Sequence, residues 1–227
     1  MTDQPSRIRS FVLRHGRMTV GQRRAFEQGW PKYGLERSAG HIDPVDSFGR
    51  AGRTVMEIGF GMGQSLVTMA AAEPDINFIG VEVHRPGVGR LLHSMAEHDV
   101  SNIRIYCDDA VPVLEECFGL ASLDGIQIYF PDPWHKKRHH KRRLIQTRFV
   151  ALLCERLRPG GFLHLATDWK NYAEHMMEVL SAAGDLVNTA GNGQFAPRPA
   201  RRPITKFEQR GQRLGHGVWD LLFERAK

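Results

Sequence analysis

The sequence has 227 residues, 41% of them hydrophobic, and 31 Lys and Arg against 25 Asp and Glu give a formal net charge of +6. This hydrophobic content can build a folded core, which excludes a disordered or fibrous chain. No apolar run approaches the roughly 20 residues that a membrane helix needs, and arginines interrupt the N-terminal segment, which argues against a signal peptide. We expect an unprocessed cytoplasmic protein with no membrane contact.

Short apolar runs alternate with amphipathic segments between residues 54 and 168, a pattern typical of βαβ units. The predicted strands are Thr54–Gly59, Phe78–Val83, Ile103–Cys107, Gly125–Phe130 and Gly161–Thr167. The predicted helices are Gln64–Ala72, Val88–His98, Ala110–Cys117 and Leu144–Leu157. The predicted fold class is therefore α/β, with a doubly wound, mostly parallel sheet and helices on both faces.

The two ends of the chain are less regular. Residues 1–53 show no strong period and are predicted to be a basic N-terminal extension packed on a domain of residues 54–227. After Met177–Ala183 the chain becomes rich in Gly, Asn, Pro and Arg, and Val218–Arg225 is predicted to be the last strand. No internal repeat or low-complexity linker divides the chain, so we expect a single domain overall.

Three cysteines are present, at positions 107, 117 and 154. Their odd number and wide spacing favour buried thiols in a reducing compartment over a disulfide framework or a zinc site.

Positive charge is concentrated in three segments. Residues 1–24 and 198–213 each hold six Lys or Arg and one acid, whereas residues 135–143 (HKKRHHKRR) hold six and no acid. The rest of the chain has ten more acids than bases. Clustered Lys and Arg on an acidic scaffold are typical of a polyanion binder, so nucleic acid is the first partner to consider.

A glycine-rich turn, MEIGFGMGQS, joins the first predicted strand to the first predicted helix. Gly59, Gly61 and Gly63 let the backbone turn tightly and approach a ligand closely. Glu82 ends the next strand, where a carboxylate can accept hydrogen bonds from both hydroxyls of a ribose. The combination predicts a cofactor that contains a nucleoside, with Gly59, Gly61 and Glu82 among its contacts.

The turn disfavours a nicotinamide dinucleotide, because the third glycine comes one residue earlier than in the motif G-x-G-x-x-G. Glu57 stands two residues before the first glycine, where its charge would repel a pyrophosphate and attract a cationic amino-acid tail. S-adenosyl-L-methionine carries such a tail and no phosphate. We therefore predict it as the cofactor, with Glu57 as a further contact.

More acids follow predicted strands, at the edge where open α/β sheets bind ligands. Either Asp108 or Asp109 can accept a hydrogen bond from an adenine amino group, or Asp109 can cap the helix that starts at Ala110. Asp132 lies between two prolines in FPDPW, which suggests a rigid carboxylate at the mouth of a pocket. Asp168 is either a site residue or the cap of the helix that follows.

The basic run at residues 135–143 follows Asp132 closely and is expected beside the same pocket. Its six cations repel one another unless a polyanion screens them, which favours a nucleic-acid contact over a solvated helix start. His135, His139 and His140 lie in this run, but no Cys or carboxylate joins them, and a metal ion would add to the repulsion. We therefore expect no metal site.

A segment near the C-terminus, Arg201 to Glu208, combines cations suited to phosphate with Thr205 and Glu208, which can read the edge of a base. The pairing edge of guanine offers N–H donors, which carboxylates accept well. The segment is therefore a candidate contact for a guanine in RNA.

Five strings together resemble the bacterial tRNA (guanine-N(7)-)-methyltransferase family: EIGFGMG, GVEVHRPGVG, FPDPWHKKRHHKRR, ATDW, and RPITKFEQRG with GHGVWDLLFER. The similarity covers most of the chain from Arg7 onward, and the block around FPDPW is highly specific. The resemblance implies a Rossmann-like class I methyltransferase fold. It also implies methyl transfer from S-adenosyl-L-methionine to N7 of a guanine in the variable loop of tRNA, which makes tRNA the expected partner.

The resemblance also assigns roles to residues of this chain. The implied cofactor contacts are Glu57, Glu82, Asp109 and Asp132, and Asp132 is also the implied catalytic position. The implied substrate contacts are Lys136, Asp168, Thr205, Lys206, Phe207 and Glu208. The implied RNA contacts are Arg138, His139, His140, Lys141, Arg142 and Arg143.

Two other classes of protein remain open. A methyltransferase for a small molecule or a protein would explain the nucleoside site but not the three basic segments. An RNA-binding module without catalysis would explain the charge but not Glu57, the glycine turn and Glu82 together. The sequence does not distinguish a monomer from a homodimer.

Overall fold

The computed structural model describes residues 10–12, 16–204, 208 and 217–227. Its described strands form one eight-stranded sheet in the order β1-β4-β3-β2-β5-β6-β8-β7. The strands are β1 (Gly34–Leu35), β2 (Thr54–Ile58), β3 (Asn77–Val81), β4 (Ile103–Tyr106), β5 (Leu123–Tyr129), β6 (Leu157–Thr167), β7 (Leu186–Asn188) and β8 (Trp219–Arg225). Strands β1 to β6 pair in parallel, and β8 pairs antiparallel with both β6 and β7.

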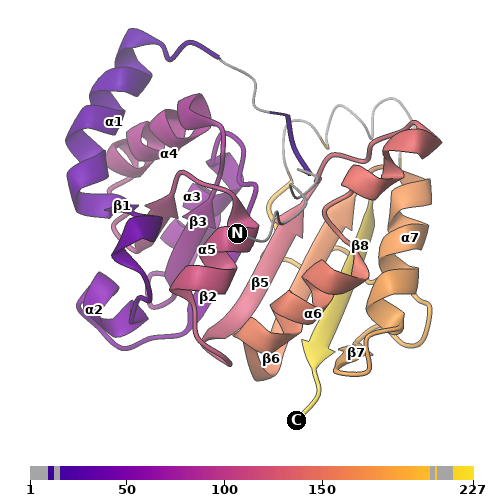
Figure 1. Cartoon of the computed structure of the whole chain (residues 1–227). Coiled ribbons are helices and arrows are strands. Elements are labelled where there is room, and N and C mark those ends of the chain that lie inside the picture. Colours follow the sequence, from indigo (N-terminus) through magenta and orange to yellow (C-terminus); the bar gives the residue numbers. More distant parts are fainter. Residues whose placement is uncertain (1–9, 13–15, 205–207, 209–216) are drawn as a thin grey trace, which may run out of the picture.

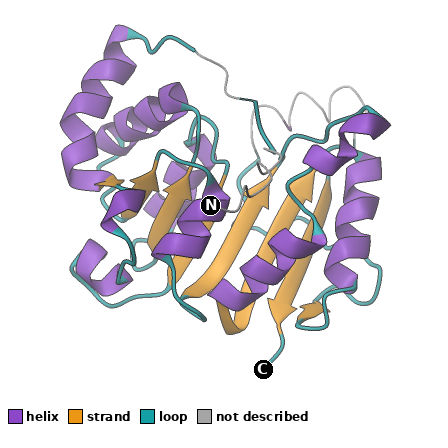
Figure 2. Ribbon diagram, viewed as in Figure 1, coloured by secondary structure: helices purple, strands orange, loops and turns teal. Residues whose placement is uncertain are grey.

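Helices cover both faces of this sheet (Figures 1 and 2). They are α1 (Val20–Tyr33), α2 (Pro44–Phe48), α3 (Gln64–Ala72), α4 (Arg85–Glu97), α5 (Ala110–Cys117), α6 (Thr147–Arg156) and α7 (Lys170–Ser181), with short 3₁₀ helices η1 (Arg37–Ala39) and η2 (Lys137–Arg142). The predicted α/β class with a doubly wound, mostly parallel sheet is therefore confirmed.

Alternate side chains of the central strands point to opposite faces and build two apolar cores. Met56, Ile58 and Ile128 belong to one core, which also contains side chains of α5, α6 and α7. Val55 and Phe78 belong to the other core, together with side chains of α3 and α4. Because both faces are covered, β2 and β3 are buried along their whole length.

The five predicted parallel strands are all present, with ends that differ by up to four residues. The largest difference is at β6, which starts at Leu157 because this residue pairs with Leu123 of β5 before an irregularity in the register. The helix predicted from Leu144 starts only at Thr147. The residue before it, Gln146, has an extended backbone (φ −135°, ψ 157°) and serves as the N-cap, and the backbone N–H of Ile145 donates to the Tyr172 hydroxyl.

The N-terminal region contains a helix that the periodicity did not predict. Helix α1 has only Phe26 fully buried, so its apolar stripe is weak in the sequence. The signal that could have revealed it is a capping box: the Thr19 hydroxyl accepts from the backbone of Gln22, whose side chain accepts in return from the backbone of Thr19. Helix α1 packs against α4, and β1 extends the sheet beyond β4.

The chain from Phe195 to Arg202 returns to the sheet before β8. Ala196 forms an antiparallel bridge with Asp220 of β8, and the guanidinium of Arg201 stacks 3.6 Å from the ring centre of Phe162 on β6. This segment brings Arg202 into the interior, where it is 1% exposed and pairs with Glu208, which is 2% exposed.

Candidate active site

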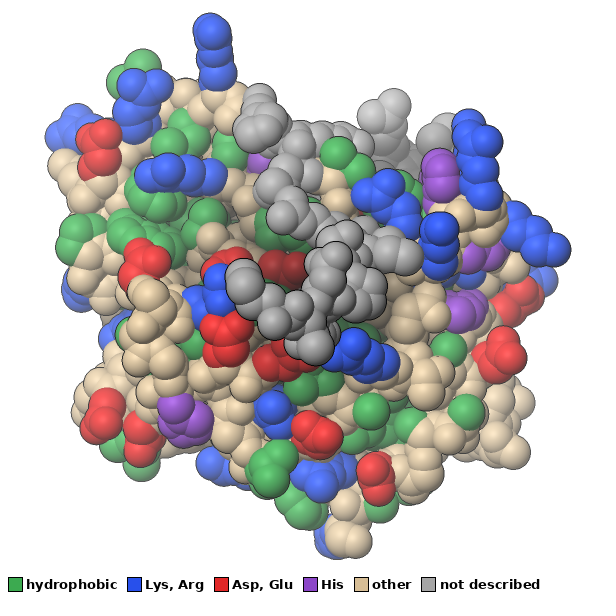
Figure 3. All heavy atoms as spheres, in the orientation of Figure 1, with side chains coloured by type: hydrophobic (Ala, Val, Ile, Leu, Met, Phe, Trp, Pro, Cys, Tyr) green, Lys and Arg blue, Asp and Glu red, His purple; other side chains and the backbone are tan. Residues whose placement is uncertain are grey.

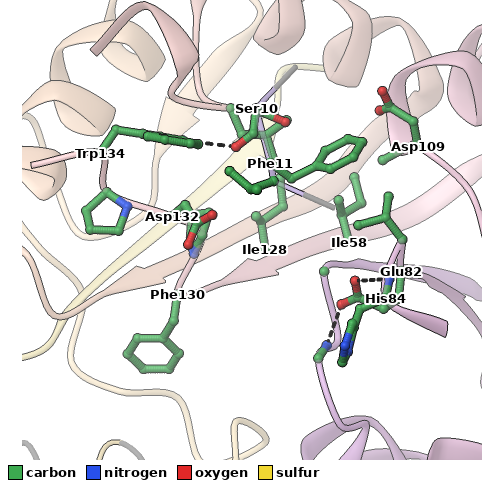
Figure 4. A pocket seen from close by; sticks show the side chains of 18 of the residues that line it. Ser10, Phe11, Ile58, Glu82, His84, Asp109, Ile128, Phe130, Asp132 and Trp134 are labelled. Carbon is green, nitrogen blue, oxygen red and sulfur yellow. Dashed lines mark hydrogen bonds between the residues drawn. The ribbon is translucent and has the colours of Figure 1, made fainter. Parts of the chain in front are cut away.

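A cavity of about 740 Å³ opens at the carboxyl ends of β2, β3, β4 and β5. Ile58 and Ile128 form its apolar floor, and Glu82 and Asp132 lie on opposite sides of them (Figure 4). Parallel sheets place ligands at this edge, where neighbouring strands end and their connections diverge.

The glycine turn after β2 borders this cavity with its backbone. Gly59 and Gly61 both line the cavity and have positive φ angles of 77° and 59°. A β-carbon on either residue would meet no atom within 4 Å, so these positions face open space. Glycine is required here by the backbone conformation, and its small size leaves room for a ligand against the main chain.

Glu82 fixes the turn from the end of β3. Its two carboxylate oxygens accept from the backbone N–H groups of Gly61 and His84, both at 2.8 Å (Figure 4). Burial raises the pKa of Glu82, although these backbone hydrogen bonds and the nearby His84 oppose the shift. The structure thus brings the predicted cofactor contacts Gly59, Gly61 and Glu82 together at one wall of the cavity.

Asp108 and Asp109 both line the cavity after β4, but they have different partners. Asp108 accepts a hydrogen bond of 2.8 Å from Arg37, which also pairs with Glu116. Asp109 caps α5 by accepting from the backbone of Val111 at 3.1 Å. Asp109 therefore both caps α5 and lines the cavity, whereas Asp108 forms an ion pair with Arg37.

The loop that carries Asp132 has a strained backbone on both sides. Phe130 and Trp134 have positive φ angles of 52° and 48°, which cost free energy in residues with a β-carbon. Several contacts impose this conformation. The N–H of Phe130 donates to Ala166, the indole of Trp134 donates to the carbonyl of Ser10, and Pro133 accepts from a buried arginine. Asp132 is exposed on this constrained loop and lines the cavity.

The basic run divides into surface and buried side chains. Lys136, Arg138 and Lys141 are exposed. Figure 3 shows blue and purple side chains gathered at the upper right, the region of η2 in Figure 1. Partial burial and then the surrounding cations lower the pKa of His139 and of His140. Lys136 and His139 also line the cavity, so the basic surface begins at its rim.

Arg143 departs from the sequence prediction of an RNA contact. It is only 3% exposed, and its guanidinium donates to the carbonyl of Pro133 at 3.0 Å and to Asn171 at 2.7 Å. It also packs over the Tyr172 ring. Arg143 therefore holds the loop of Asp132 from inside the protein, and we leave it out of the RNA surface. Arg142 stacks on Trp134 with 4.0 Å between the guanidinium carbon and the ring centre.

Three described residues among the predicted cofactor and substrate contacts do not line the cavity. Glu57 is 3% exposed and its carboxylate accepts a hydrogen bond of 3.1 Å from Gln127. Asp168 is half-buried after β6 and does not cap α7, whose N-cap is Trp169. Glu208 is buried in an ion pair with Arg202. Contacts of these three with ligands stay predictions.

The predicted substrate contacts Thr205, Lys206 and Phe207 lie outside the described residues.

The sequence did not predict that the N-terminal segment reaches the cavity. Ser10, Phe11 and Val12 line it, and the carbonyl of Ser10 accepts from the Trp134 indole at 2.9 Å (Figure 4). Phe11 lies over the apolar floor in the same view. The only local signal for this contact is the apolar triplet Phe11-Val12-Leu13 within a basic segment, which sequence alone does not place.

Two features are absent from the described residues. Within them, no helix is both long and apolar enough to span a membrane. The same residues contain no group of three or more His, Cys, Asp or Glu side chains placed to hold a metal ion. All three cysteines are free, and Cys117 and Cys154 are buried.

The walls of the cavity suit a positively charged nucleoside ligand without phosphate. Glu82, Asp108, Asp109 and Asp132 give it four carboxylates, whereas its cations, Lys136 and the neighbouring basic run, stand at one rim. Carboxylates favour a cation nearby and repel phosphate. Together with the open glycine turn, this arrangement fits an adenosine that carries a cationic side chain.

Comparison with known proteins agrees with this geometry. A family model described as "Putative methyltransferase" matches residues 51–221. A tRNA (guanine-N(7)-)-methyltransferase of Alcanivorax borkumensis is 61% identical over 96% of this chain and 92% of its own length. One from Marinobacter nauticus is 58% identical, with coverage of 96% and 92%.

Solved structures show the same fold at low sequence identity. A mutant of the 16S rRNA (adenine(1408)-N(1))-methyltransferase from Catenulisporales acidiphilia aligns with a TM-score of 0.54 and 13% identity. The alignment covers 82% of this chain and 92% of that one.

Proposed function

This chain belongs to the tRNA (guanine-N(7)-)-methyltransferase family, and from that premise we propose that it transfers a methyl group to N7 of a guanine in the variable loop of tRNA. One observation of the structure carries the proposal: an acidic nucleoside cavity whose rim continues directly into an exposed basic surface. A methyltransferase for small molecules would not need that surface. Because tRNA is the proposed substrate, we propose a cytoplasmic location.

S-adenosyl-L-methionine is the cofactor, and when bound it supplies a methyl group on a positively charged sulfur. Gly59 and Gly61 would leave space for it beside the main chain, and Glu82 would accept from its ribose hydroxyls. We propose Asp109 as the acceptor for its adenine amino group, because it lines the cavity and a carboxylate that caps a helix can accept further hydrogen bonds.

The reaction needs positioning more than acid or base catalysis. N7 of guanine has a lone pair in the plane of the ring and no proton, so no side chain has to remove one. Holding the reacting atoms in line supplies most of the rate acceleration. The guanine becomes positively charged as it reacts, and a fixed carboxylate beside it stabilises that change. Asp132 is suited to this role because its loop is rigid and it lines the cavity.

The guanine has to leave its stack before it can enter the cavity, which costs a few kcal/mol. Contacts with phosphates offset this cost, and each of them makes binding weaker as salt increases. Arg138 and Lys141 are exposed beside the rim and are our candidates for such contacts. Asp168 and Glu208 are the proposed carboxylates for the donor edge of the guanine.

Transfer of a tritiated methyl group to unmodified bulk tRNA, followed by nucleoside analysis, tests the proposed reaction. We expect label in 7-methylguanosine. Label in another nucleoside, or none, would show that the assignment of the reaction is wrong.

Single-turnover transfer at saturating cofactor and tRNA tests the role of Asp132. We expect Asp132→Asn to react on the order of 100-fold more slowly, the usual cost of losing one group that stabilises developing charge. Asp75→Asn makes the same chemical change at an exposed position before β3 and should keep the wild-type rate. Equal rates for wild type and Asp132→Asn would remove Asp132 from the mechanism.

Salt-dependent binding of tRNA tests the basic surface. We expect the double variant Arg138→Ala, Lys141→Ala to bind more weakly and with a log-log salt slope about 1.5 smaller, if both cations contact phosphates. Arg53→Ala, Lys227→Ala removes the same charge at the opposite edge of the sheet and should bind normally. Cofactor affinity should be unchanged in both, and equal salt slopes in the two variants would contradict this surface.

A further inference from the structure

Seven buried polar side chains form an unbroken series of hydrogen bonds across one face of the sheet. We call this series the core chain, and none of its members is more than 8% exposed. In order they are Glu57, Gln127, Tyr129, His164, Asp220, Arg202 and Glu208. Buried polar groups are costly unless each is paired, so the hydrogens along the core chain have to be arranged consistently.

The register of the strands explains why these side chains meet. Glu57 of β2 lies opposite Gln127 of β5, and Gln127 lies opposite His164 of β6. Residues opposite each other on neighbouring strands point to the same face. Asp220 of β8 continues this row, because it lies two residues from Leu222, the partner of His164. The core chain thus crosses four adjacent strands.

The contacts in the middle of the core chain are short. Gln127 Nε2 lies 3.1 Å from Glu57 Oε2, and Gln127 Oε1 lies 3.1 Å from the Tyr129 hydroxyl. That hydroxyl is also 2.9 Å from Nδ1 of His164, whose Nε2 is 2.8 Å from Asp220 Oδ1. Every link is within hydrogen-bond distance, so each needs one hydrogen.

Arg202 forms a fork between two carboxylates at the far end. It donates to both oxygens of Asp220 at 2.8 and 2.9 Å, and to both oxygens of Glu208 at 2.6 and 2.9 Å. Burial raises the pKa of Asp220, but the hydrogen bonds from His164 and Arg202 outweigh it, and the net pKa is lowered. Asp220 is therefore ionised, and the hydrogen between it and His164 belongs to His164.

The single hydrogen of the Tyr129 hydroxyl then decides the charge of His164. If it points to Gln127 Oε1, His164 has to donate from both ring nitrogens and is a cation. If it points to His164, the imidazole is neutral and Gln127 has to donate to Tyr129 from its amide nitrogen. The amide oxygen then faces Glu57, which must be protonated to complete the link.

The two arrangements contain the same number of protons. An ionised Glu57 requires a charged His164, and a neutral His164 requires a protonated Glu57. Passing from the second arrangement to the first moves the hydroxyl hydrogen of Tyr129 to His164 Nδ1. The proton released by Glu57 replaces it on the Tyr129 oxygen, and the Gln127 amide turns by half a rotation. In the first arrangement the Gln127 amide also donates to Met69, whose sulfur lies 3.6 Å from Gln127 Nε2.

We propose that the core chain makes this protein distinguish its positively charged cofactor from the neutral thioether product, by moving one proton between Glu57 and His164. The inference rests on the proposed function. The core chain reaches the cavity at Tyr129, which lines it, and Glu57 directly precedes Ile58 and Gly59, which line it as well. A cation in the cavity stabilises the ionised form of Glu57, and the proton is then held at His164. Once the positive charge has left the sulfur, the proton returns to Glu57.

When no cation occupies the cavity, burial favours the second arrangement, in which Glu57 is protonated and His164 is neutral. Burial raises the pKa of Glu57 to about 8, helped by the charge of Glu82 and opposed by the hydrogen bond from Gln127. Burial lowers the pKa of His164, and its contact with Asp220 opposes that shift. Three links join His164 to Glu208, through Asp220 and Arg202, so the core chain connects the proposed cofactor side with the proposed guanine contact.

Nitrogen NMR of the full-length protein labelled in histidine tests the proposal without requiring turnover. The signals of His164 are assigned through correlation to its own β-carbon and recorded with S-adenosylmethionine and with S-adenosylhomocysteine. We expect the imidazolium pattern with the first ligand and the neutral pattern with the second. His98, whose Nδ1 contacts the carbonyl of Ser94, serves as an internal reference. The same state of His164 in both complexes would overturn the proposal.

Two variants separate the proton movement from a purely structural role. Glu57→Gln imitates the protonated acid, and Tyr129→Phe interrupts the core chain between Gln127 and His164. We expect His164 to stop responding to the ligand in both. In Glu57→Gln, the ratio of affinities should also shift toward the thioether by about tenfold, the equivalent of one pKa unit. A His164 that still responds in Tyr129→Phe would contradict the route through the hydroxyl.

Methyl transfer to tRNA on the same samples separates the two levels of inference. Normal methyl transfer with a His164 that does not respond to the ligand contradicts the proposed proton movement but not the proposed reaction. Absence of cofactor binding contradicts both, and a responsive His164 without label in tRNA contradicts the proposed reaction alone.

Discussion

Replacing Glu57 by Gln should change how stability depends on pH. The folded protein holds the carboxyl proton up to about pH 8, whereas an unfolded chain loses it near 4.5. Between these values the folded state binds more protons, so its stability falls as pH rises. From about pH 6.5 to about pH 8, with half-titration at the upper end, the loss is about 1.5 kcal/mol. Glu57→Gln cannot lose this proton and should not show that loss.

Urea unfolding followed by tryptophan fluorescence at the two pH values measures this difference. Lowered pKa values at His139, His140 and His164 make the folded protein more stable as pH rises through their titration. That titration lies mostly below this pH window. The raised pKa of Glu82 acts in both proteins and cancels in the comparison. Glu174→Gln, at an exposed position of α7, is the control and should keep the wild-type dependence. Identical pH dependence in wild type and Glu57→Gln would refute the reasoning.

Two further substitutions test how the cavity is held. A β-carbon on Gly87 would lie 2.1 Å from the carbonyl oxygen of Gly61, so Gly87→Ala should displace the turn and slow methyl transfer on the order of 100-fold. Gly21→Ala meets no atom within 4 Å and should leave transfer unchanged while stabilising α1 by about 0.5 kcal/mol, as urea unfolding would show. Arg143→Ala leaves the carbonyl of Pro133 without its donor and should cost about 3 kcal/mol of unfolding free energy. A stability loss below about 0.5 kcal/mol would contradict the structural role of Arg143.

The sequence predicted those features whose signal is local. The parallel strands were visible as apolar runs, and the glycine turn and Glu82 were visible because spacing along one βαβ unit fixes their distance. The sequence also showed the charge of the basic run, but it did not show which of its side chains point to solvent and which point into the protein. Arg143 therefore looked like its neighbours, although it points inward to Pro133 and Asn171.

The core chain shows what local patterns cannot predict. Gln127 and Glu57 are 70 residues apart, and His164 and Asp220 are 56 apart. Their proximity depends on which strands are neighbours and in which register, and no sequence window contains that information. Glu57 was assigned to the cofactor from its place before the glycine turn. The structure adds that its carboxylate lies in the core and that its partner is an amide on β5.

The buried fork of Arg202 calls for an explanation other than stability. Charges taken out of water lose hydration free energy that their mutual attraction roughly restores, so apolar side chains of similar volume would stabilise the fold at least as well. An apolar cluster would not fix the orientation of these side chains, whereas four hydrogen bonds from one planar guanidinium hold Glu208 and Asp220 relative to each other. The fork is therefore better explained by the position it gives to Glu208. Glu208 lies at the end of the core chain and is proposed to hold the guanine. A change in the charge of His164 therefore acts on Glu208 through Asp220 and Arg202.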